Sequence, residues 1–204
     1  GLDPYVIRPS TYNLLIEPNF NLKDLLFESR ENLFLVPANA ELIAAEYRLI
    51  NQPDRTTRLR NAISRNGTSF DFILIDTPPS LSLLTVNGIA AAHELLIPVA
   101  TNYLSMRGVR SLLDSVWLIR ERINPNLKLL GVLPTLVHAD TPHAMSAIIE
   151  MQTVFKSKVF RTFIPYDEVA AMAPATRQSA IDYDPQSTVA LAYQELAKEV
   201  SNVQ

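Results

Sequence analysis

From residue 32 onward, short apolar runs alternate with longer segments in which apolar residues recur with helical periodicity. The short runs predict strands at Leu33–Val36, Phe72–Ile75, Leu95–Val99, Lys128–Leu133 and Val159–Phe163. The longer segments predict helices at Glu41–Asn51, Thr56–Arg65, Leu83–Ala92, Val109–Ile123, Ala144–Phe155 and Ser187–Val200. Buried parallel strands read as continuous apolar runs, and the connections have room for crossover helices. We therefore expect an α/β fold of three layers with a mostly parallel sheet.

The first 31 residues do not open with a strand. They predict a surface loop and a short helix, with Thr11–Leu15 and Leu22–Leu26 as apolar anchors. The chain has 204 residues, of which 48% are hydrophobic and 19% charged, enough to bury one full core. We expect residues 1–204 to form a single domain.

Composition excludes several classes of site. The net charge is −3, so no global positive field attracts nucleic acid, and any DNA contact must come from a local patch. The absence of cysteine excludes disulfides and thiolate metal sites and agrees with a cytoplasmic location. No apolar run approaches the roughly 18 residues that span a bilayer, so we expect no membrane partner.

The segment Phe70–Ser80 carries the most informative chemistry. It combines a predicted buried strand with Asp76 at the carboxyl end, where open α/β sheets bind ligands. In P-loop NTPases an aspartate in this position holds magnesium, usually through a water. Pro78 and Pro79 then fix the direction in which the chain leaves the strand. The alternative is an aspartate that only caps the end of a strand.

The string Asp71–Asn87 resembles the Walker B and switch II region of the ParA/MinD family, and the resemblance covers nearly the whole chain. Further matching segments, in order, are Leu35–Asn39 with Glu46, Leu96–Val99 with Tyr103–Ser105 and Gly108, Asn124–Leu127 before Gly131–Leu133, and Asp182–Ser187. The resemblance implies a P-loop NTPase-like fold, with ATP and Mg as ligands. It also implies that Asp76 places the magnesium and that Thr77 and Pro78 form the switch that senses the γ-phosphate.

Family members begin with a strand, a Gly-rich loop of the deviant Walker A type with two lysines, and a switch I aspartate. These features are absent from this sequence, whose glycines are isolated. Successive backbone N–H groups are needed to cradle a triphosphate. The fold expected for this chain therefore lacks the first strand and the P-loop, and we expect this chain alone to bind ATP poorly. A non-catalytic interaction module that retains the ParA scaffold is the alternative to an ATPase.

The loop Ile164–Glu168 resembles the family's adenine-binding loop, which implies that Pro165 and Asp167 border the base. The alternative is a strand-to-helix turn in which Asp167 caps the next helix. Downstream, Val169–Gln178 departs from the family pattern.

ParA proteins partition plasmids, chromosomes or other cargo. They bind DNA non-specifically as ATP-bound homodimers, associate with the nucleoid, and hydrolyse ATP when a ParB-like partner stimulates them. The candidate DNA contacts here are Arg107 and Arg110 on one helix and Lys156 and Lys158 after another. The alternative is that these are solvated helix faces. The terminal segment Ala192–Gln204 lacks the basic amphipathic face of the membrane-targeted members.

Overall fold

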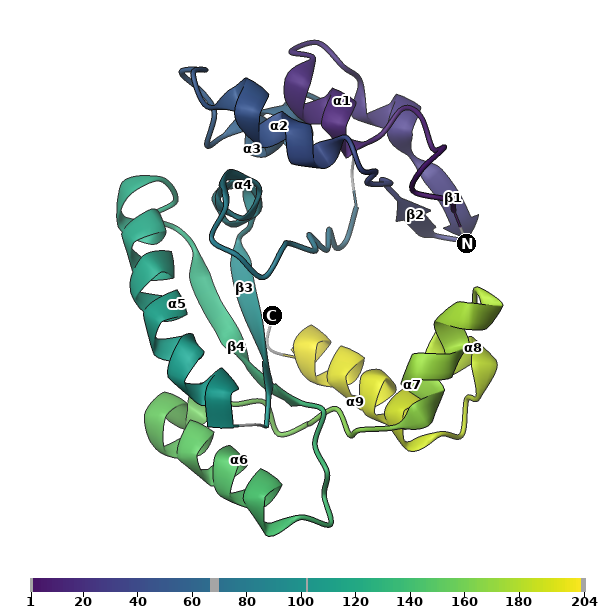
Figure 1. Cartoon of the computed structure of the whole chain (residues 1–204), viewed down its shortest axis with the longest axis vertical. Helices are drawn as coiled ribbons and strands as arrows, with labels where there is room; N and C mark the ends of the chain where they lie inside the picture. The colour runs from purple at the N-terminus through teal and green to yellow at the C-terminus, as the bar shows by residue number, and fades with distance from the viewer. Residues whose placement is uncertain (1, 67–69, 102, 203–204) are drawn as a thin grey trace. The chain divides into compact units, whose positions relative to one another are not determined.

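The computed structural model describes residues 2–66, 70–101 and 103–202, and only the backbone of residues 103–111. The chain packs as two compact units (Figure 1). One contains Leu2–His93 and Ser115–Leu127, and the other contains Glu94–Asp114 and Lys128–Gln204. Each unit is described by itself.

The first unit begins with short elements that polar caps delimit. Helix α1 (Thr11–Ile16) starts after Ser10, whose hydroxyl accepts a hydrogen bond from the N–H of Tyr12. A 3-10 turn, η1 (Leu22–Leu25), starts after Asn21 in the same way. Strands β1 (Phe27–Arg30) and β2 (Leu33–Leu35) then form an antiparallel hairpin.

Three helices complete this unit, and polar side chains tie them together. They are α2 (Leu42–Leu49), α3 (Arg58–Asn66) and α4 (Leu83–Ala91). The buried Asn87 of α4 donates to the carbonyl of Arg55 at 2.7 Å and accepts from the N–H of Leu59 at 3.2 Å, which joins α4 to the start of α3. An apolar cluster beneath α1, η1 and α3 contains Leu14, Leu22, Leu25 and Ala62.

The second unit is built on two parallel strands, β3 (Glu94–Ala100) and β4 (Lys128–Thr135). Helix α5 (Tyr103–Arg122) joins them along the chain, although its residues from Ser115 onward belong to the first unit, and α6 (Pro142–Phe155) follows β4. The remaining elements are η2 (Lys156–Lys158), α7 (Glu168–Met172), η3 (Ala173–Thr176), α8 (Ala180–Tyr183) and α9 (Thr188–Asn202).

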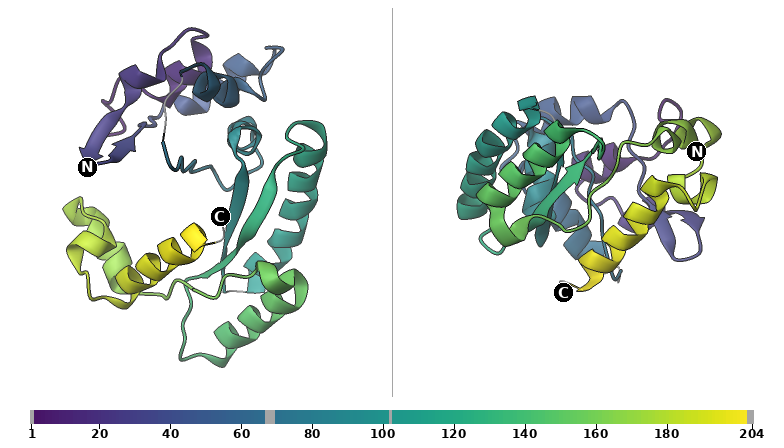
Figure 2. Two further views of the ribbon diagram at one scale, coloured as in Figure 1. Left: turned by 180° about the vertical axis from the view of Figure 1, so that it is seen from behind. Right: turned by 90° about the horizontal axis from the view of Figure 1, so that it is seen from below.

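Helices cover both faces of β4, which produces the expected three layers. On one face, Val132 packs with Met151 of α6 in a buried cluster. On the other face, Leu133 packs with Val189 of α9. Figures 1 and 2 accordingly show α6 and α9 on opposite sides of the two strands.

All the predicted helices are confirmed, although α5 begins six residues before Val109, at Tyr103. Strand predictions are confirmed for β2, β3 and β4. The prediction of a strand at Phe72–Ile75 is wrong for this structure, because the segment has no regular secondary structure and no described strand pairs with it. Val159–Phe163 forms only an isolated parallel bridge, from Val159 to Val132. Strand β1 was not predicted.

Candidate functional site

The segment from Asp76 to Ser80 follows the irregular Phe72–Ile75 stretch and is exposed. The carboxylate of Asp76 forms no hydrogen bond or ion pair with any residue of the described part of the chain. An exposed and unengaged carboxylate is available to bind a hydrated cation. Thr77 and Pro78 come directly after it in the same exposed loop.

Helix α4 holds this loop through Thr85 in its first turn. The Thr85 hydroxyl lies 2.6 Å from the carbonyl oxygen of Ser80 and 3.2 Å from that of Pro78. Both carbonyls belong to the turn that follows Asp76, so Thr85 ties the turn to a rigid element. The sequence prediction did not include Thr85, although a hydroxyl residue in the first helical turn after two prolines was a usable signal.

Gly88 brings α4 close to the same loop. A Cβ at this position would lie 2.6 Å from Cγ2 of Thr77 and 3.4 Å from Cγ2 of Ile75. The first distance is shorter than van der Waals contact allows, so only glycine permits the observed approach. Gly88 and Thr85 therefore set the position of the residues beside Asp76.

The start of α4 is capped from another helix. Ser82 occupies the N-cap position, but its buried hydroxyl has no partner among the described residues. Instead, Oε1 of Glu46 in α2 accepts the N–H of Leu84 at 3.2 Å. A carboxylate near the positive end of the helix dipole stabilises the helix. Glu46 thus fixes the end of α4 that carries the loop contacts.

Pro165 and Asp167 lie in the second unit, after a segment that runs beside the end of β4 and the residues that follow it. The N–H of Ile164 donates to the carbonyl of Pro134 at 2.9 Å, and the N–H of Tyr166 donates to that of Val137 at 2.9 Å. The loop is therefore held by backbone hydrogen bonds at the carboxyl end of β4, where ligands bind in open α/β sheets.

The carboxylate of Asp167 is fully engaged within the protein. Its Oδ1 accepts the N–H of Val169 at 2.9 Å and caps α7, and its Oδ2 accepts the Thr188 hydroxyl at 2.6 Å and the N–H of Val189 at 3.3 Å. The Thr188 hydrogen bond, followed by that of Val169, lowers the pKa of Asp167 below its ordinary value. The capping alternative is observed, and the role in base binding stays a prediction.

Beside Pro165, the rings of Tyr166 and His138 are stacked, with centroids 4.5 Å apart and planes inclined by 21°. Tyr166 is 54% exposed, so this pair presents a flat aromatic surface at the carboxyl end of β4. The sequence prediction missed the pair, because nothing in the local sequence indicates that residues 28 positions apart meet.

The basic candidates are only partly described. Lys156 and Lys158 are the first and last residues of the turn η2 and are exposed. Arg107 and Arg110 belong to α5, but their side chains lie outside the described residues.

Within the described ranges, no group of three or more His, Asp or Glu side chains is arranged to hold a metal, and no helix has the length and apolarity needed to cross a membrane.

Comparison with known proteins places the chain in a family. Residues 1–129 match the family described as an AAA domain. The chain is 34% identical over 201 residues to the sporulation initiation inhibitor protein Soj of Bacillus subtilis, covering 98% of this chain and 79% of Soj. It is 36% identical over 169 residues to the chromosome-partitioning ATPase Soj of Treponema pallidum, covering 83% and 67%. The chain belongs to the ParA/MinD family.

Solved structures agree with this family assignment. A cobyrinic acid a,c-diamide synthase from Mycobacterium smegmatis, with bound ADP and magnesium, superposes with a TM-score of 0.82 at 31% identity and covers 97% of this chain and 73% of its own. An ATP complex of McdA from Cyanothece gives a TM-score of 0.76 at 22% identity, with 96% and 74% covered, and supports the fold alone. The P-loop NTPase-like α/β fold expected of a family member is therefore confirmed.

Proposed function

We propose that this chain belongs to a ParA-type ATPase that partitions plasmids, chromosomes or another cargo. The observation that carries the proposal is the exposed Asp76–Ser80 loop, held by α4, in a chain similar to Soj over 98% of its length. The ATP-bound form would dimerise and bind DNA non-specifically on the nucleoid in the cytoplasm. A ParB-like partner would stimulate hydrolysis.

The residues present suit a magnesium–nucleotide complex. Magnesium retains several waters and is usually held by one or two carboxylates together with substrate phosphates. Asp76 supplies one free carboxylate, and the lack of a larger acidic cluster among the described residues agrees with that mode of binding. Bound Mg–ATP would supply the phosphoryl group for hydrolysis. Asp76 would hold a magnesium-bound water, while Thr77 and Pro78 would respond to the γ-phosphate.

At the other candidate position, Pro165 would border the adenine. Asp167 would border it as well, and its hydrogen bonds with Val169, Thr188 and Val189 hold the loop in place. The exposed Tyr166 and His138 pair supports this location, since flat aromatic surfaces stack well on bases.

The DNA-binding surface would include Lys156, Lys158, Arg107 and Arg110. A dimer presents each residue twice, so a local patch can overcome the net charge of −3. Replacing Lys156 and Lys158 with Gln would lower the salt slope of DNA binding by about four for the dimer, because each lysine bound to a phosphate contributes about one to the slope. A matched pair of Lys23→Gln and Lys128→Gln substitutions would leave the slope unchanged.

A calorimetric titration with Mg–ATP tests the nucleotide site. It compares the 204-residue chain with the same chain fused behind the Gly-rich phosphate-binding segment of a Soj relative. Tight binding and hydrolysis only by the fused protein, with hydrolysis lost in an Asp76→Asn variant, would support the ATPase. The isolated glycines of this sequence favour the second candidate, a non-catalytic interaction module. Failure of both proteins to bind would support that module.

A further inference from the structure

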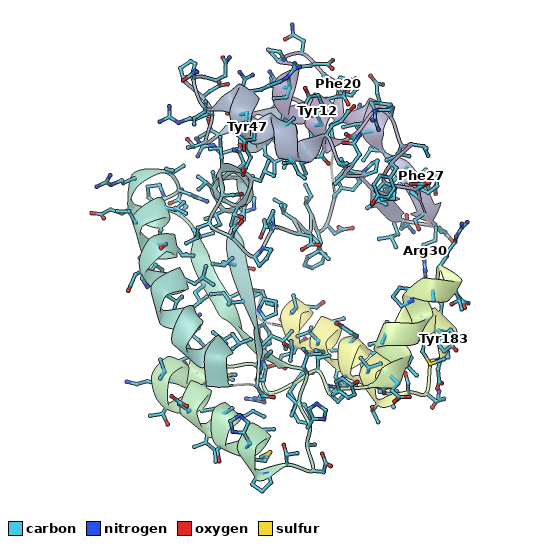
Figure 3. The ribbon with its side chains drawn as sticks, viewed as in Figure 1. Tyr12, Phe20, Phe27, Arg30, Tyr47 and Tyr183 are labelled. Atoms are coloured by element: carbon cyan, nitrogen blue, oxygen red, sulfur yellow. The ribbon has the colours of Figure 1, made fainter. Side chains whose placement is uncertain are left out.

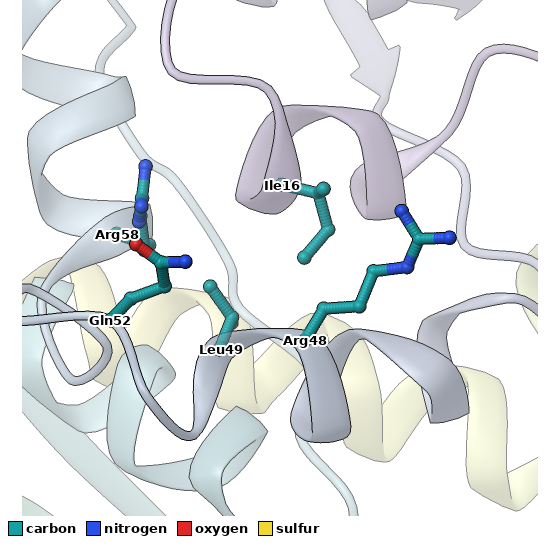
Figure 4. A pocket seen from close by; sticks show the side chains of 5 residues that line it. All are labelled: Ile16, Arg48, Leu49, Gln52 and Arg58. Atoms are coloured by element: carbon teal, nitrogen blue, oxygen red, sulfur yellow. The ribbon is translucent and has the colours of Figure 1, made fainter.

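A cavity of about 380 Å³ lies among α1, α2 and the start of α3, within the first unit. Its lining consists of Ile16, Arg48, Leu49, Gln52 and Arg58. Figure 4 shows the aliphatic side chains of Ile16 and Leu49 between Arg48 on one side and Gln52 with Arg58 on the other. None of these residues belongs to the loops that carry Asp76 or Pro165, so the cavity is a separate feature.

The two arginines differ in how their charge is balanced. Arg58 has a side chain only 13% exposed, and its Nε lies 3.0 Å from Oδ1 of Asp54. Arg48 has no carboxylate within ion-pair distance in the described part of the chain, and its guanidinium lies 5.8 Å from the centre of the Tyr12 ring. Tyr12 projects from α1 and is labelled in Figure 3. One uncompensated positive charge therefore borders the cavity.

Two further polar groups at the cavity lack partners. The buried Nε of Arg58 is close to Asp54, but the contact does not have hydrogen-bond geometry, so this N–H has no acceptor among the described residues. A buried donor without an acceptor costs free energy, which a ligand acceptor would recover. The carboxamide of Gln52, at the same side of the cavity, also forms no hydrogen bond with the residues described here.

The lining thus combines a free guanidinium, an aliphatic wall, an exposed carboxamide, and a buried N–H group without an acceptor among the described residues. Arginine binds carboxylates through paired N–H donors. Ile16 and Leu49 favour an apolar branched group between the polar ends. A carboxamide can both donate to and accept from a peptide bond.

We propose that this cavity binds a carboxylate that carries an apolar side chain and an amide, as the carboxyl terminus of a peptide ending in an aliphatic residue does. Arg48 pairs with the carboxylate, and Ile16 and Leu49 contact the aliphatic group. Gln52 and the N–H of Arg58 bind the preceding amide. The proposal is independent of ATP binding, because no residue of the nucleotide site takes part.

The test is an NMR titration of the ¹⁵N-labelled 204-residue chain with N-acetyl-leucine. A ligand of only about 12 non-hydrogen atoms is expected to bind with a Kd on the order of millimolar. The expected result is a saturable shift of the Nε–H signals of Arg48 and Arg58. N-acetyl-leucinamide, which lacks the carboxylate, should not produce it.

An Arg48→Gln variant should bind N-acetyl-leucine about tenfold more weakly or worse, because a charge-assisted hydrogen bond is lost. Arg65→Gln removes the same charge from an exposed position of α3 outside the cavity and should bind as the unaltered chain does. An acetylated tripeptide ending in leucine should bind at least as tightly as N-acetyl-leucine. Weaker binding of the tripeptide, equal binding of the amide, or unchanged affinity in Arg48→Gln would overturn the proposal.

Discussion

Gly88 lies so close to Thr77 that the effect of Gly88→Ala on stability should depend on one methyl group, Cγ2 of Thr77. Replacing Gly88 with Ala adds a Cβ 2.6 Å from Cγ2 of Thr77, so the helix or the loop must move. Overpacking of this kind costs about 1–3 kcal/mol. Alanine gains about 1 kcal/mol over glycine in a helix interior. The net loss expected for Gly88→Ala is therefore between about 0 and 2 kcal/mol.

The companion substitution Thr77→Ser removes the methyl group and leaves the hydroxyl. The nearest remaining atom is then Cγ2 of Ile75 at 3.4 Å, which is ordinary van der Waals contact. In this background, Gly88→Ala should stabilise the protein by about 0.5–1 kcal/mol through helix propensity and reduced entropy of the unfolded chain. The two substitutions should therefore show a coupling free energy of about 1–3 kcal/mol.

Urea denaturation of the four proteins measures this coupling from the midpoints and slopes. A slope that stays constant shows that the substitutions act on the folded state. The reasoning fails if Gly88→Ala has the same effect in both backgrounds, within about 0.5 kcal/mol. That result would mean that Thr77 rotates away at no cost, and that α4 does not fix the side chain beside Asp76.

Three further predictions concern the scaffold. Asn87→Leu should lower the free energy of unfolding by about 2–4 kcal/mol in urea denaturation, because it removes three backbone hydrogen bonds from a position only 1% exposed; a loss below about 1 kcal/mol would contradict that role. Gly131→Ala should cost about 2–3 kcal/mol by the same measurement, since its Cβ would lie 2.7 Å from the Phe160 ring and 2.8 Å from the carbonyl oxygen of Lys158, and only the ring can move; a neutral effect would refute the packing argument. Burial raises the pKa of Glu199, but N–H donors from residues 161 and 162 outweigh it, so the pKa of Glu199, like that of Asp167, is lower than in the unfolded chain. The contribution of the two carboxylates to the free energy of unfolding is thus complete above about pH 5 and is lost as pH falls through their folded pKa values. In a variant with both residues changed to the amide, the urea midpoint should therefore fall less between pH 6 and pH 3 than in the unaltered protein. An equal fall in both proteins would count against this account.

Much of the fold could be predicted because helical periodicity is a local signal. The segments around α2, α4, α6 and α9 are helical as their sequences indicate, and each buries at least one apolar residue, such as Leu49 in α2 and Met151 in α6. Strands depend on partners. Phe72–Ile75 has the composition of a buried strand, yet Leu74 is 93% exposed and no described strand pairs with it. Composition predicts how a segment behaves when paired, and it carries no information about which strand is available.

The residues of the candidate site show the same difference between local signals and contacts that depend on the fold. Asp76 was found from its position after an apolar run, and Asp167 was found from the resemblance of the loop Ile164–Glu168 to the family's adenine-binding loop. Both predictions depend on a few adjacent residues. Thr85, Glu46 and the His138 and Tyr166 pair act across long sequence separations. Each becomes meaningful only when the fold brings its partner within hydrogen-bond or stacking distance. Local sequence can therefore identify candidate residues for a ligand site, whereas the residues that hold them in place must be read from the packed structure.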